Sequence, residues 1–566
     1  MRASVRDISR TLLLFTFVGL CQSNPANADE AKFVDCSLLV APGYPSTWPQ
    51  GFPRFRIIHD RVIGPRSAYN TDILYIDGNT ATQMDVPPHS VVRPELKMPK
   101  SGKFGHHFTE AIEAWQFGGE ACIVDCRDLL NKAPNGVSPL VKIDRLKAWE
   151  KKHRPFRFGD VVLVRSDYSD KFYRPLPEGR RFLASPLERK TPAWPDPNPE
   201  AMEFLAGVRK VMHVGTDSPT MGPIPDLGEP THYAALKHGA IFTEAATNLG
   251  KLPTTGAFYC LMGPKHKGGP YGEARAFAIV GNVAKFLIDA SRNKRAIDLS
   301  PTLDIDMPLT WPGKGVDNHR HRYTKADFLY AATLQLYHHT HIMDSHCGTH
   351  LVPPSYALPP GKLDVQSYAP EVRGWLEEYE RKFGPRGSST ITTADVPLSQ
   401  TCGWARVIDA TSLVGTTNAN AWPASPEISV DLIKADEAKN GPLKANQIVI
   451  FRTGHIDKHM KAFPEGVELM EDPLNGKSEG WPAVGAAAVT YLAKKGIRCV
   501  ATDAPTLGGV DDRQALMTYW ALGSRNIVGV EFLQNVGKIP DRAYFLFAPV
   551  KIQGCHGGPG RAIVLH

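Results

Sequence analysis

The chain has 566 residues, of which 42% are hydrophobic and 22% are charged, and its formal net charge is +7. This length exceeds what one hydrophobic core usually supports, and the composition excludes a disordered or fibrous protein. The positive charge is spread along the sequence without a run of five basic residues, so nucleic acid is not an expected partner.

The N-terminus has the pattern of an export signal. Three arginines precede an apolar run from Leu12 to Leu20, and a polar stretch then ends in Ala-Asn-Ala at residues 26–28. This order predicts a cleavable signal peptide over residues 1–28, a mature chain that begins near Asp29, and a secreted or periplasmic location. No later apolar stretch is long enough to span a bilayer, so we expect no membrane anchor after cleavage.

Short apolar runs alternate with a few helical patterns along the rest of the chain. Residues 29–60 are rich in proline, glycine and aromatic residues and predict irregular structure. Strands are predicted at residues 73–76, 122–125, 161–164, 211–217 and 447–451. Helices are predicted at residues 199–211, within 281–300, at 326–337 and at 484–493, the third because Thr324 and Asp327 stand in capping-box order. The alternation indicates an α/β fold.

One segment of the sequence occurs twice. Asp344 to Pro354 reads Asp-Ser-His-Cys-Gly-Thr-His-Leu-Val-Pro-Pro, and the segment that begins at Asp77 can be laid on it with Asp77 on Asp344. Further landmarks keep the same order, and their spacing drifts only slightly along the chain. They are Thr47-Trp48-Pro49 with Thr310-Trp311-Pro312, Val124-Asp125 with Ile408-Asp409, Asp217-Ser-Pro219 with Asp503-Ala-Pro505, and Gly268-Gly-Pro270 with Gly557-Gly-Pro559.

These matches predict an internal duplication of a unit of about 250 residues. We expect a first α/β domain over residues 29–280, a linker over 281–300 and a second domain over 301–566, packed on each other as an internal pseudo-dimer. Whether the chain assembles further is left open.

Two histidines in the repeated segment have metal-ligand spacing. His346 and His350 flank a Gly-Thr pair that turns the backbone, so both imidazoles can reach one divalent cation. Two histidines that make ordinary loop contacts would have the same pattern. In the first copy, Asn79 and Gln83 stand at these two positions.

The segment resembles the metal-dependent cyclase and kynurenine formamidase family, whose motif runs H-x-G-T-H-x-D-x-P-x-H. Each copy retains only part of the motif. The second copy matches it at His346, Gly348, Thr349, His350 and Pro354, but has Val352 for the aspartate and Tyr356 for the last histidine. The first copy matches it at Thr82, Asp85, Pro87 and His89, but has Asn79, Ala81 and Gln83 at the remaining positions.

The family also uses a histidine followed, twelve residues later, by a glutamate. The first copy has His232 and Glu244 at this spacing, and the second copy has Tyr519 and Glu531. The resemblance therefore implies a first site in which His89 is the acid/base and the ligands are Asp85, His232 and Glu244, with neutral oxygens from Asn79 and Gln83. It implies a second candidate site made of His346, His350 and Glu531.

Such a site would hold one or two divalent metal ions, Mn²⁺ or Zn²⁺, with the neutral oxygen ligands favouring Mn²⁺. Two functions follow from the resemblance. One is an exported hydrolase that cleaves a formamide, amide, lactam or lactone of a small-molecule substrate with metal-activated water, in the first copy. The other is a degenerate, non-catalytic small-molecule or metal-binding protein on the same fold. Two structural roles are the alternatives to metal binding: Asp85 could cap a turn, and His232 could be a histidine of the core.

Overall fold

The computed structural model of the chain describes residues 31–46, 48–49, 53–312, 323–331 and 336–566. The expected signal peptide and the cleavage point near Asp29 lie outside the described residues. None of the helices in this part of the chain has the length and apolar character needed to cross a bilayer. The eight cysteines from Cys36 onward are buried free thiols.

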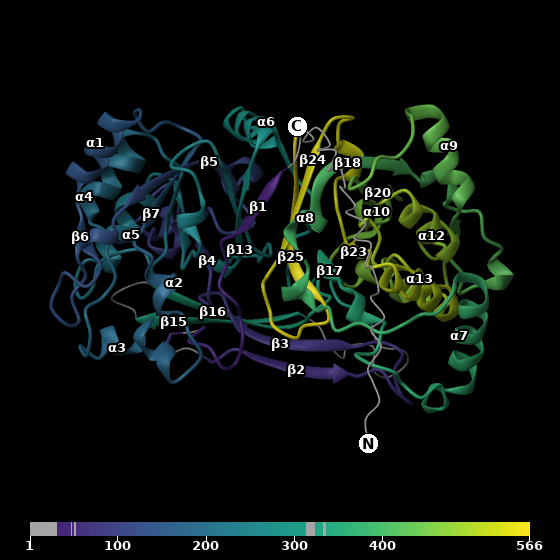
Figure 1. Ribbon diagram of the computed structural model, residues 1–566. Helices are drawn as coiled ribbons and strands as arrows, with labels where there is room; N and C mark the ends of the chain where they lie inside the picture. Colours follow the sequence, from purple (N-terminus) through teal and green to yellow (C-terminus); the bar gives the residue numbers. More distant parts are fainter. Residues whose placement is uncertain (1–30, 47, 50–52, 313–322, 332–335) are drawn as a thin grey trace, which may run out of the picture.

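The first unit is built on a nine-stranded mixed sheet that extends over the left half of Figure 1. Its central strands β5, β7, β9 and β10 are parallel, and the others pair antiparallel. Side chains of β7, β9, β10 and β11 are almost all buried, as expected for strands covered on both faces. The order is β1 (Lys32–Asp35), β13 (Arg275–Val280), β11 (Phe258–Met262), β5 (Gly118–Asp125), β7 (Asp160–Arg165), β9 (His213–Thr216), β10 (Ile241–Glu244), β4 (Gln83–Asp85) and β12 (Tyr271–Glu273).

The second unit repeats this sheet with eight strands. The long strand β25 pairs with β14, β17 and β24, and so takes the places of both β12 and β13. The order is β14 (Ala296–Asp298), β25 (Gly558–Leu565), β17 (His350–Val352), β23 (Val528–Glu531), β22 (Cys499–Thr502), β20 (Ile448–Arg452), β18 (Cys402–Asp409) and β24 (Tyr544–Pro549). The small parallel pairs β6 (Leu140–Val141) with β8 (Asp196–Pro197), and β19 (Glu427–Ile428) with β21 (Ala483–Val484), also occur once in each unit.

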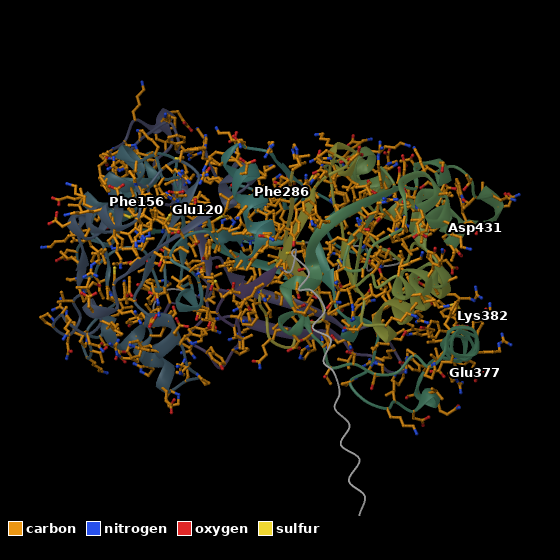
Figure 2. The ribbon with its side chains drawn as sticks, turned by 45° about the horizontal axis from the view of Figure 1, so that its top comes forward. Glu120, Phe156, Phe286, Glu377, Lys382 and Asp431 are labelled. Atoms are coloured by element: carbon orange, nitrogen blue, oxygen red, sulfur yellow. The ribbon has the colours of Figure 1, made fainter. Side chains whose placement is uncertain are left out.

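The helices confirm the duplication, because four of them begin at one constant sequence offset from their counterparts. These four pairs are α1 (Ile143–Lys152) and α9 (Val430–Asn440), α2 (Tyr168–Phe172) and α10 (His455–His459), α3 (Ala184–Leu187) and α11 (Glu471–Leu474), and α4 (Pro199–Met202) and α12 (Ala486–Lys494). A π-helical turn, η6 (Glu203–Val208), extends α4. The other helices are α5 (Gly228–Leu236), α6 (Asn282–Arg292), α7 (Pro370–Phe383), α8 (Leu398–Thr401) and α13 (Asp512–Ser524). Exposed charges such as Glu377 and Lys382 on α7 and Asp431 on α9 lie on the outer surface of the second unit (Figure 2).

The landmark aspartates occupy the same place in the two units, as predicted. Asp217 follows β9 and accepts hydrogen bonds from the backbone N–H and hydroxyl of Ser166 and from the N–H of Asp167. Asp503 follows β22 and accepts the same three bonds from Thr453 and Gly454. The duplicated sequence thus folds into duplicated structure.

Strand register corrects one of the predicted matches. Gln83 pairs with Glu273, and the position equivalent to Gln83, His350, pairs with Pro559. Glu273 and Pro559 are therefore equivalent. The predicted matches of Pro270 with Pro559 and of Gly268 with Gly557 were therefore wrong. They arose because a glycine-glycine-proline segment lies within a few residues of the equivalent position in each unit.

A four-stranded sheet joins the two units along the lower side of Figure 1. It contains β2 (Arg56–Arg61) and β3 (Thr71–Asp77) of the first unit with β15 (Thr324–Ala331) and β16 (Leu336–Asp344) of the second, in the order β15-β16-β3-β2. Tyr75 faces Ile342 where β3 and β16 pair. These two positions are equivalent when Asp77 is laid on Asp344, so a pseudo-two-fold axis passes between them.

This sheet overturns two expectations. The helix predicted over 326–337 is wrong, because the described residues of this segment belong to β15 and β16. Pairing with the other unit decides the conformation there, and such tertiary pairing overrides weak local helix propensity. The region 29–60 is not wholly irregular either, because β1 and most of β2 lie within it. The segment 281–300 contains α6 and β14, and β14 already pairs with the sheet of the second unit.

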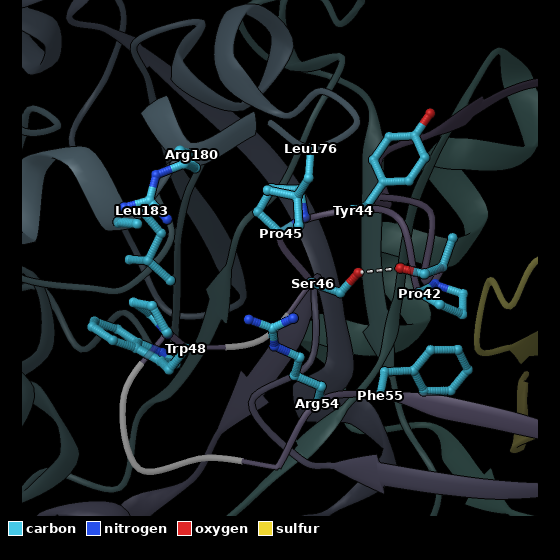
Figure 3. Close-up of a pocket in the computed structure, with 13 residues that line it drawn as sticks. Pro42, Tyr44, Pro45, Ser46, Trp48, Arg54, Phe55, Leu176, Arg180 and Leu183 are labelled. Carbon is cyan, nitrogen blue, oxygen red and sulfur yellow. Dashed lines mark hydrogen bonds between the residues drawn. The ribbon is translucent and has the colours of Figure 1, made fainter. Parts of the chain in front are cut away.

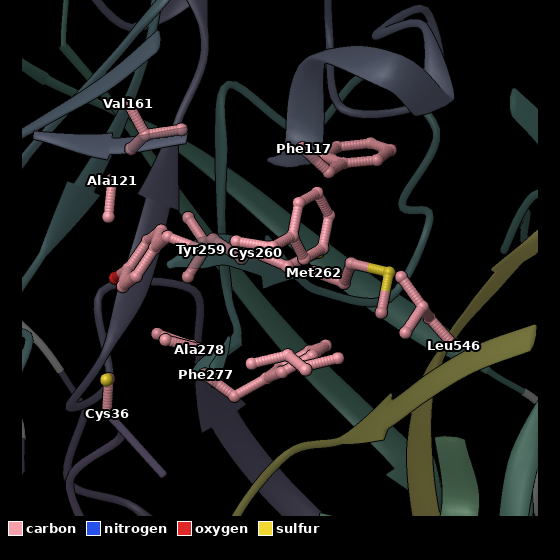
Figure 4. Close-up of a cluster of buried hydrophobic side chains, with 14 of the residues drawn as sticks. Cys36, Phe117, Ala121, Val161, Tyr259, Cys260, Met262, Phe277, Ala278 and Leu546 are labelled. Atoms are coloured by element: carbon pink, nitrogen blue, oxygen red, sulfur yellow. The ribbon is translucent and has the colours of Figure 1, made fainter. Parts of the chain in front are cut away.

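The two units share an apolar core. Met262 and Phe277 of the first unit belong to one buried cluster with Tyr544, Leu546 and Ile563 of the second (Figure 4). Burying an aromatic or large aliphatic side chain contributes roughly 1.5–3 kcal/mol. Such a core is expected of an obligate interface rather than of two domains on a flexible tether.

Candidate functional site

The central strand of the first site is β4. It pairs with β10 on one side and β12 on the other, so Gln83 lies between Glu244 and Glu273, and Asp85 lies beside Phe242. Because alternate residues of a strand share a face, these polar side chains emerge on the same face of the sheet. The short helix η1 (Pro87–His89) follows β4, and α5 carries His232 toward the same place.

Four predicted residues meet at this point. The Nε2 atom of His232 lies 3.3 Å from Asp85 Oδ2 and 3.3 Å from Glu244 Oε1. His89 Nε2 lies 3.8 Å from the same Asp85 oxygen, and the two imidazole rings are 5.2 Å apart. Asp85 and Glu244 are almost fully buried. The structure therefore brings together Asp85, His89, His232 and Glu244.

Burial dominates the electrostatics of this cluster. Loss of solvent, followed by the charge of Glu244, raises the pKa of Asp85 to about 7. Burial lowers the pKa of His232, but its contacts with Asp85 and Glu244 outweigh this and raise it well above its usual range. Burial in turn raises the pKa of Glu244, and His232 more than compensates, so that pKa is lowered. The cluster holds two acids and one cationic imidazole.

The hydrogen bonds orient His232 as in a metal ligand. Its Nδ1 lies 2.8 Å from the carbonyl oxygen of Gly228, so Nδ1–H donates there and Nε2 faces the carboxylates. Metal-ligating histidines commonly use their second nitrogen in this way. Neither oxygen of Asp85 accepts a hydrogen bond from any described residue. Ligand atoms of Asp85, His89 and His232 lie within 4.8 Å of one another, and Glu244 Oε1 lies 3.3 Å from His232 Nε2, so these four side chains offer enough donors for a divalent cation.

Asn79 and Gln83 lie beside this cluster and hold Glu244. The Gln83 amide N–H group donates to Asn79 Oδ1 at 2.8 Å and to Glu244 Oε2 at 2.5 Å. The other Glu244 oxygen accepts from the backbone N–H of Met221. Gln83, itself held by Asn79, therefore fixes the orientation of the Glu244 carboxylate.

The second copy has a different set of residues at the equivalent positions. His350 Nε2 lies 3.1 Å from Glu531 Oε2, and the Tyr519 hydroxyl donates to Glu531 Oε1 at 2.6 Å. Val352 takes the place of Asp85. Among the described residues, His346, His350 and Glu531 are not one of the groups whose ligand atoms lie within 4.8 Å of one another.

A large cavity opens at this second site. It has a volume of about 430 Å³, and Trp311, His346, His350, Tyr356, Tyr519 and Glu531 contribute to its wall. Tyr69, between β2 and β3 of the first unit, also lines it and stacks on Tyr356 with ring centres 4.8 Å apart. Sequence reasoning missed Tyr69, because it reaches the site from the other copy and belongs to no local motif.

The first unit has a smaller cavity of about 90 Å³ at a related place (Figure 3). Trp48 and Leu183 line it, and their equivalents in the second unit, Trp311 and Met470, line the large cavity. Asp85, His89, His232 and Glu244 do not line this cavity.

The fold and the first site define a duplicated α/β protein with a carboxylate–histidine cluster suited to a divalent cation. A family model described as "Putative cyclase" matches residues 34–223 and 297–508, one segment in each unit. The chain belongs to this cyclase family, and the resemblance seen in its sequence is confirmed.

Individual relatives correspond to one unit of this chain. An isatin hydrolase of Roseibium aggregatum is 24% identical over 263 residues, which are 44% of this chain and 92% of that protein. A kynurenine formamidase of Bacillus cereus is 32% identical over 117 residues, 19% of this chain and 54% of that protein. A solved structure of isatin hydrolase A from Labrenzia aggregata, bound to benzyl benzoate, is 23% identical, with a TM-score of 0.36 over 44% of this chain and 94% of that one.

Proposed function

We propose that the protein is an exported metal-dependent hydrolase that cleaves an amide-type bond, in a formamide, amide, lactam or lactone, at the first site. The observation that carries the proposal is the convergence of His89, His232 and Glu244 on Asp85, whose two buried oxygens accept no hydrogen bond from the described residues. The names of the relatives support the bond type, since isatin is a lactam and a formamidase cleaves a formamide.

Asp85, His232 and Glu244 would hold the metal ion, Mn²⁺ or Zn²⁺. When bound, a divalent cation lowers the pKa of a water molecule and polarises a carbonyl group. Gln83 fixes the orientation of Glu244, and the Gly228 carbonyl fixes that of His232. His89 stands beside Asp85, where its Nε2 can take a proton from the attacking water and return it to the leaving nitrogen or oxygen.

The assignment is tested with protein purified without chelators. Metal content is measured by mass spectrometry, and hydrolysis is assayed with isatin and N-formylkynurenine, in wild type and in Asp85→Ala and His350→Ala variants. We expect Asp85→Ala to lose activity and His350→Ala to retain it. The reverse result would place the chemistry in the second unit. Wild-type protein with neither bound metal nor activity would instead indicate a non-catalytic binding protein.

A second function, non-catalytic binding of a small molecule, is favoured for the second unit by its cavity of about 430 Å³, a volume typical of ligand pockets. The aromatic wall suits a planar ring. Binding of isatin to an Asp85→Ala variant, followed by tryptophan fluorescence, tests this, with a further Tyr69→Ala substitution expected to weaken binding. Equal affinity in the two variants would contradict it.

Export is tested separately. N-terminal sequencing of protein recovered from outside the cytoplasm should find a start near Asp29. Material that retains Met1 would contradict the proposed cleavage.

A further inference from the structure

A second cluster of histidines and a carboxylate is buried on the same sheet face as the first site. Glu273 ends β12, His266 lies in the loop before that strand, and His341 comes from β16 of the second unit. All three side chains are fully buried, and their ligand atoms lie within 4.8 Å of one another. Glu273 and Glu244 flank Gln83 two strands apart, roughly 10 Å at the usual strand spacing.

A shared tyrosine orients both histidines. The Tyr323 hydroxyl lies 2.9 Å from Nδ1 of His266 and 2.9 Å from Nδ1 of His341. The two imidazole rings stack with centres 3.7 Å apart and an interplanar angle of 7°. Because both Nδ1 atoms meet the same oxygen in parallel rings, both Nε2 atoms point to the opposite side.

Glu273 lies on that opposite side. His266 Nε2 is 3.1 Å from Glu273 Oε1. Two further atoms, His341 Nε2 and Glu273 Oε2, have no hydrogen-bond partner among the described residues. The oxygen of Tyr323 has two lone pairs and can accept from both Nδ1–H groups, which leaves lone pairs on both Nε2 atoms. Two imidazole lone pairs and a carboxylate then face one another, an arrangement that favours a cation between them.

The fold itself does not require this polar group. The register of β3, β16 and β12 makes His341 equivalent to Leu74, and Glu273 equivalent to Pro559. In the same register His266 corresponds to Ile552, and the two form equivalent bridges, His266 to Leu303 and Ile552 to Val40. Leu74 and Ile552 lie buried in one apolar cluster. A buried polar atom without a partner is destabilising, so the group of His266, Glu273 and His341 needs a ligand that compensates for its burial.

We propose that His266, Glu273 and His341 form a structural zinc site that links the first unit to the β16 strand of the second. Two imidazoles and a carboxylate are a ligand set suited to Zn²⁺. Because imidazole binds a metal in its ring plane, the parallel stack would have to open for an ion to bind, and the close approach of His266 Nε2 to Glu273 Oε1 would be replaced by bonds to the ion. This site does not depend on the proposed hydrolase.

The test counts zinc ions in the full-length protein. Wild type, His341→Leu, Asp85→Asn and the double variant are stripped with chelator, titrated with Zn²⁺ and measured by calorimetry and mass spectrometry. Leucine is the residue at the equivalent position of the other unit, so it fits the packing there. Glu273→Gln is a second variant that preserves side-chain shape.

We expect His341→Leu and Glu273→Gln each to lose one equivalent of bound Zn²⁺. Zn²⁺ should raise the melting temperature of Asp85→Asn but not of the double variant. This result would support the zinc site even if Asp85→Asn left metal content unchanged and the first site proved empty. Unchanged zinc stoichiometry and affinity in both His341→Leu and Glu273→Gln would overturn the proposal.

Discussion

The substitution Asp85→Asn separates the contribution of this residue to function from its contribution to stability. Asparagine has nearly the same shape but carries no charge. In the metal-free protein, Asp85 is buried beside Glu244, and neither of its oxygens accepts a hydrogen bond from the described residues. We expect the variant to bind metal more weakly and to lose hydrolysis, and yet to be more stable than wild type at pH 8 without metal.

The magnitude follows from the raised pKa. Burial first, and then the charge of Glu244, raises the pKa of Asp85 from 3.8 to about 7 in the folded protein. The folded state therefore holds this proton at pH values where the unfolded chain has released it, and stability falls as the pH rises from about 4 to about 7. A pKa rise of this size corresponds to roughly 4 kcal/mol of lost stability at pH 8. The asparagine avoids this loss, and its advantage should shrink toward zero near pH 4.

Asp217 provides a matched control. Its pKa is also raised to about 7, with burial as the main cause, but it accepts three hydrogen bonds from Ser166 and Asp167. Asp217→Asn would avoid the same pH-dependent loss, but it exchanges an acceptor for a donor in front of those N–H groups, which costs about 1–3 kcal/mol at every pH. It should therefore be less stable than wild type at pH 4 and gain less than Asp85→Asn at pH 8. Chemical unfolding of the metal-free proteins from pH 4 to pH 8 measures both effects. If Asp85→Asn were less stable than wild type at pH 8, the reasoning would be refuted.

Three further predictions concern single contacts. If His89 transfers protons, His89→Gln should lower kcat by roughly 10²–10⁴-fold while metal content stays constant. Loss of the metal from this variant would show that His89 is a ligand instead. Tyr519→Phe removes the hydroxyl that donates to Glu531 and should lower the free energy of unfolding by about 1–3 kcal/mol. Turnover should not change, and a loss of turnover would place the chemistry in the second unit. The pairing of β13 with β11 and of β25 with β24 makes Arg275 equivalent to Arg561. Each is a buried guanidinium, paired with Asp35 and Asp298 respectively, so Arg275→Met and Arg561→Met should lower the free energy of unfolding by similar amounts, roughly 1.5–3 kcal/mol. A large difference between the two variants would contradict this equivalence.

Most of the fold could be predicted because local pattern and internal repetition agree. The apolar runs at 122–125 and 447–451 became the central strands β5 and β20, and the alanine-rich segment at 484–493 became α12. The segment at 326–337 could not be predicted, because β15 and β16 are held by pairing with the hairpin of the other unit. A local window contains no information about that partner.

The first site was predictable as far as its residues lie in the family motif. The pair Asp85 and His89 is far in sequence from the pair His232 and Glu244, and a motif with fixed spacing was needed to bring the two pairs together. Gln83 was predicted as a ligand through its amide oxygen, and in the structure its amide N–H group donates to Glu244. Tyr69 and the group of His266, Glu273 and His341 were missed, because each reaches its neighbours across the boundary between the units.

The two sites can differ because both copies lie on one chain, although the copies pack as a dimer does, with Tyr75 paired to Ile342. Equivalent positions face each other across the pseudo-two-fold axis, as they would in a dimer of identical subunits. In such a dimer one substitution changes both sites, whereas in a tandem chain each site changes alone. The first copy has Asp85 and His89 with Gln83, and the second has His350 with Val352 and Tyr356. Covalent linkage of the copies therefore allows one site to retain its acids and histidines while the other becomes a cavity with an aromatic wall.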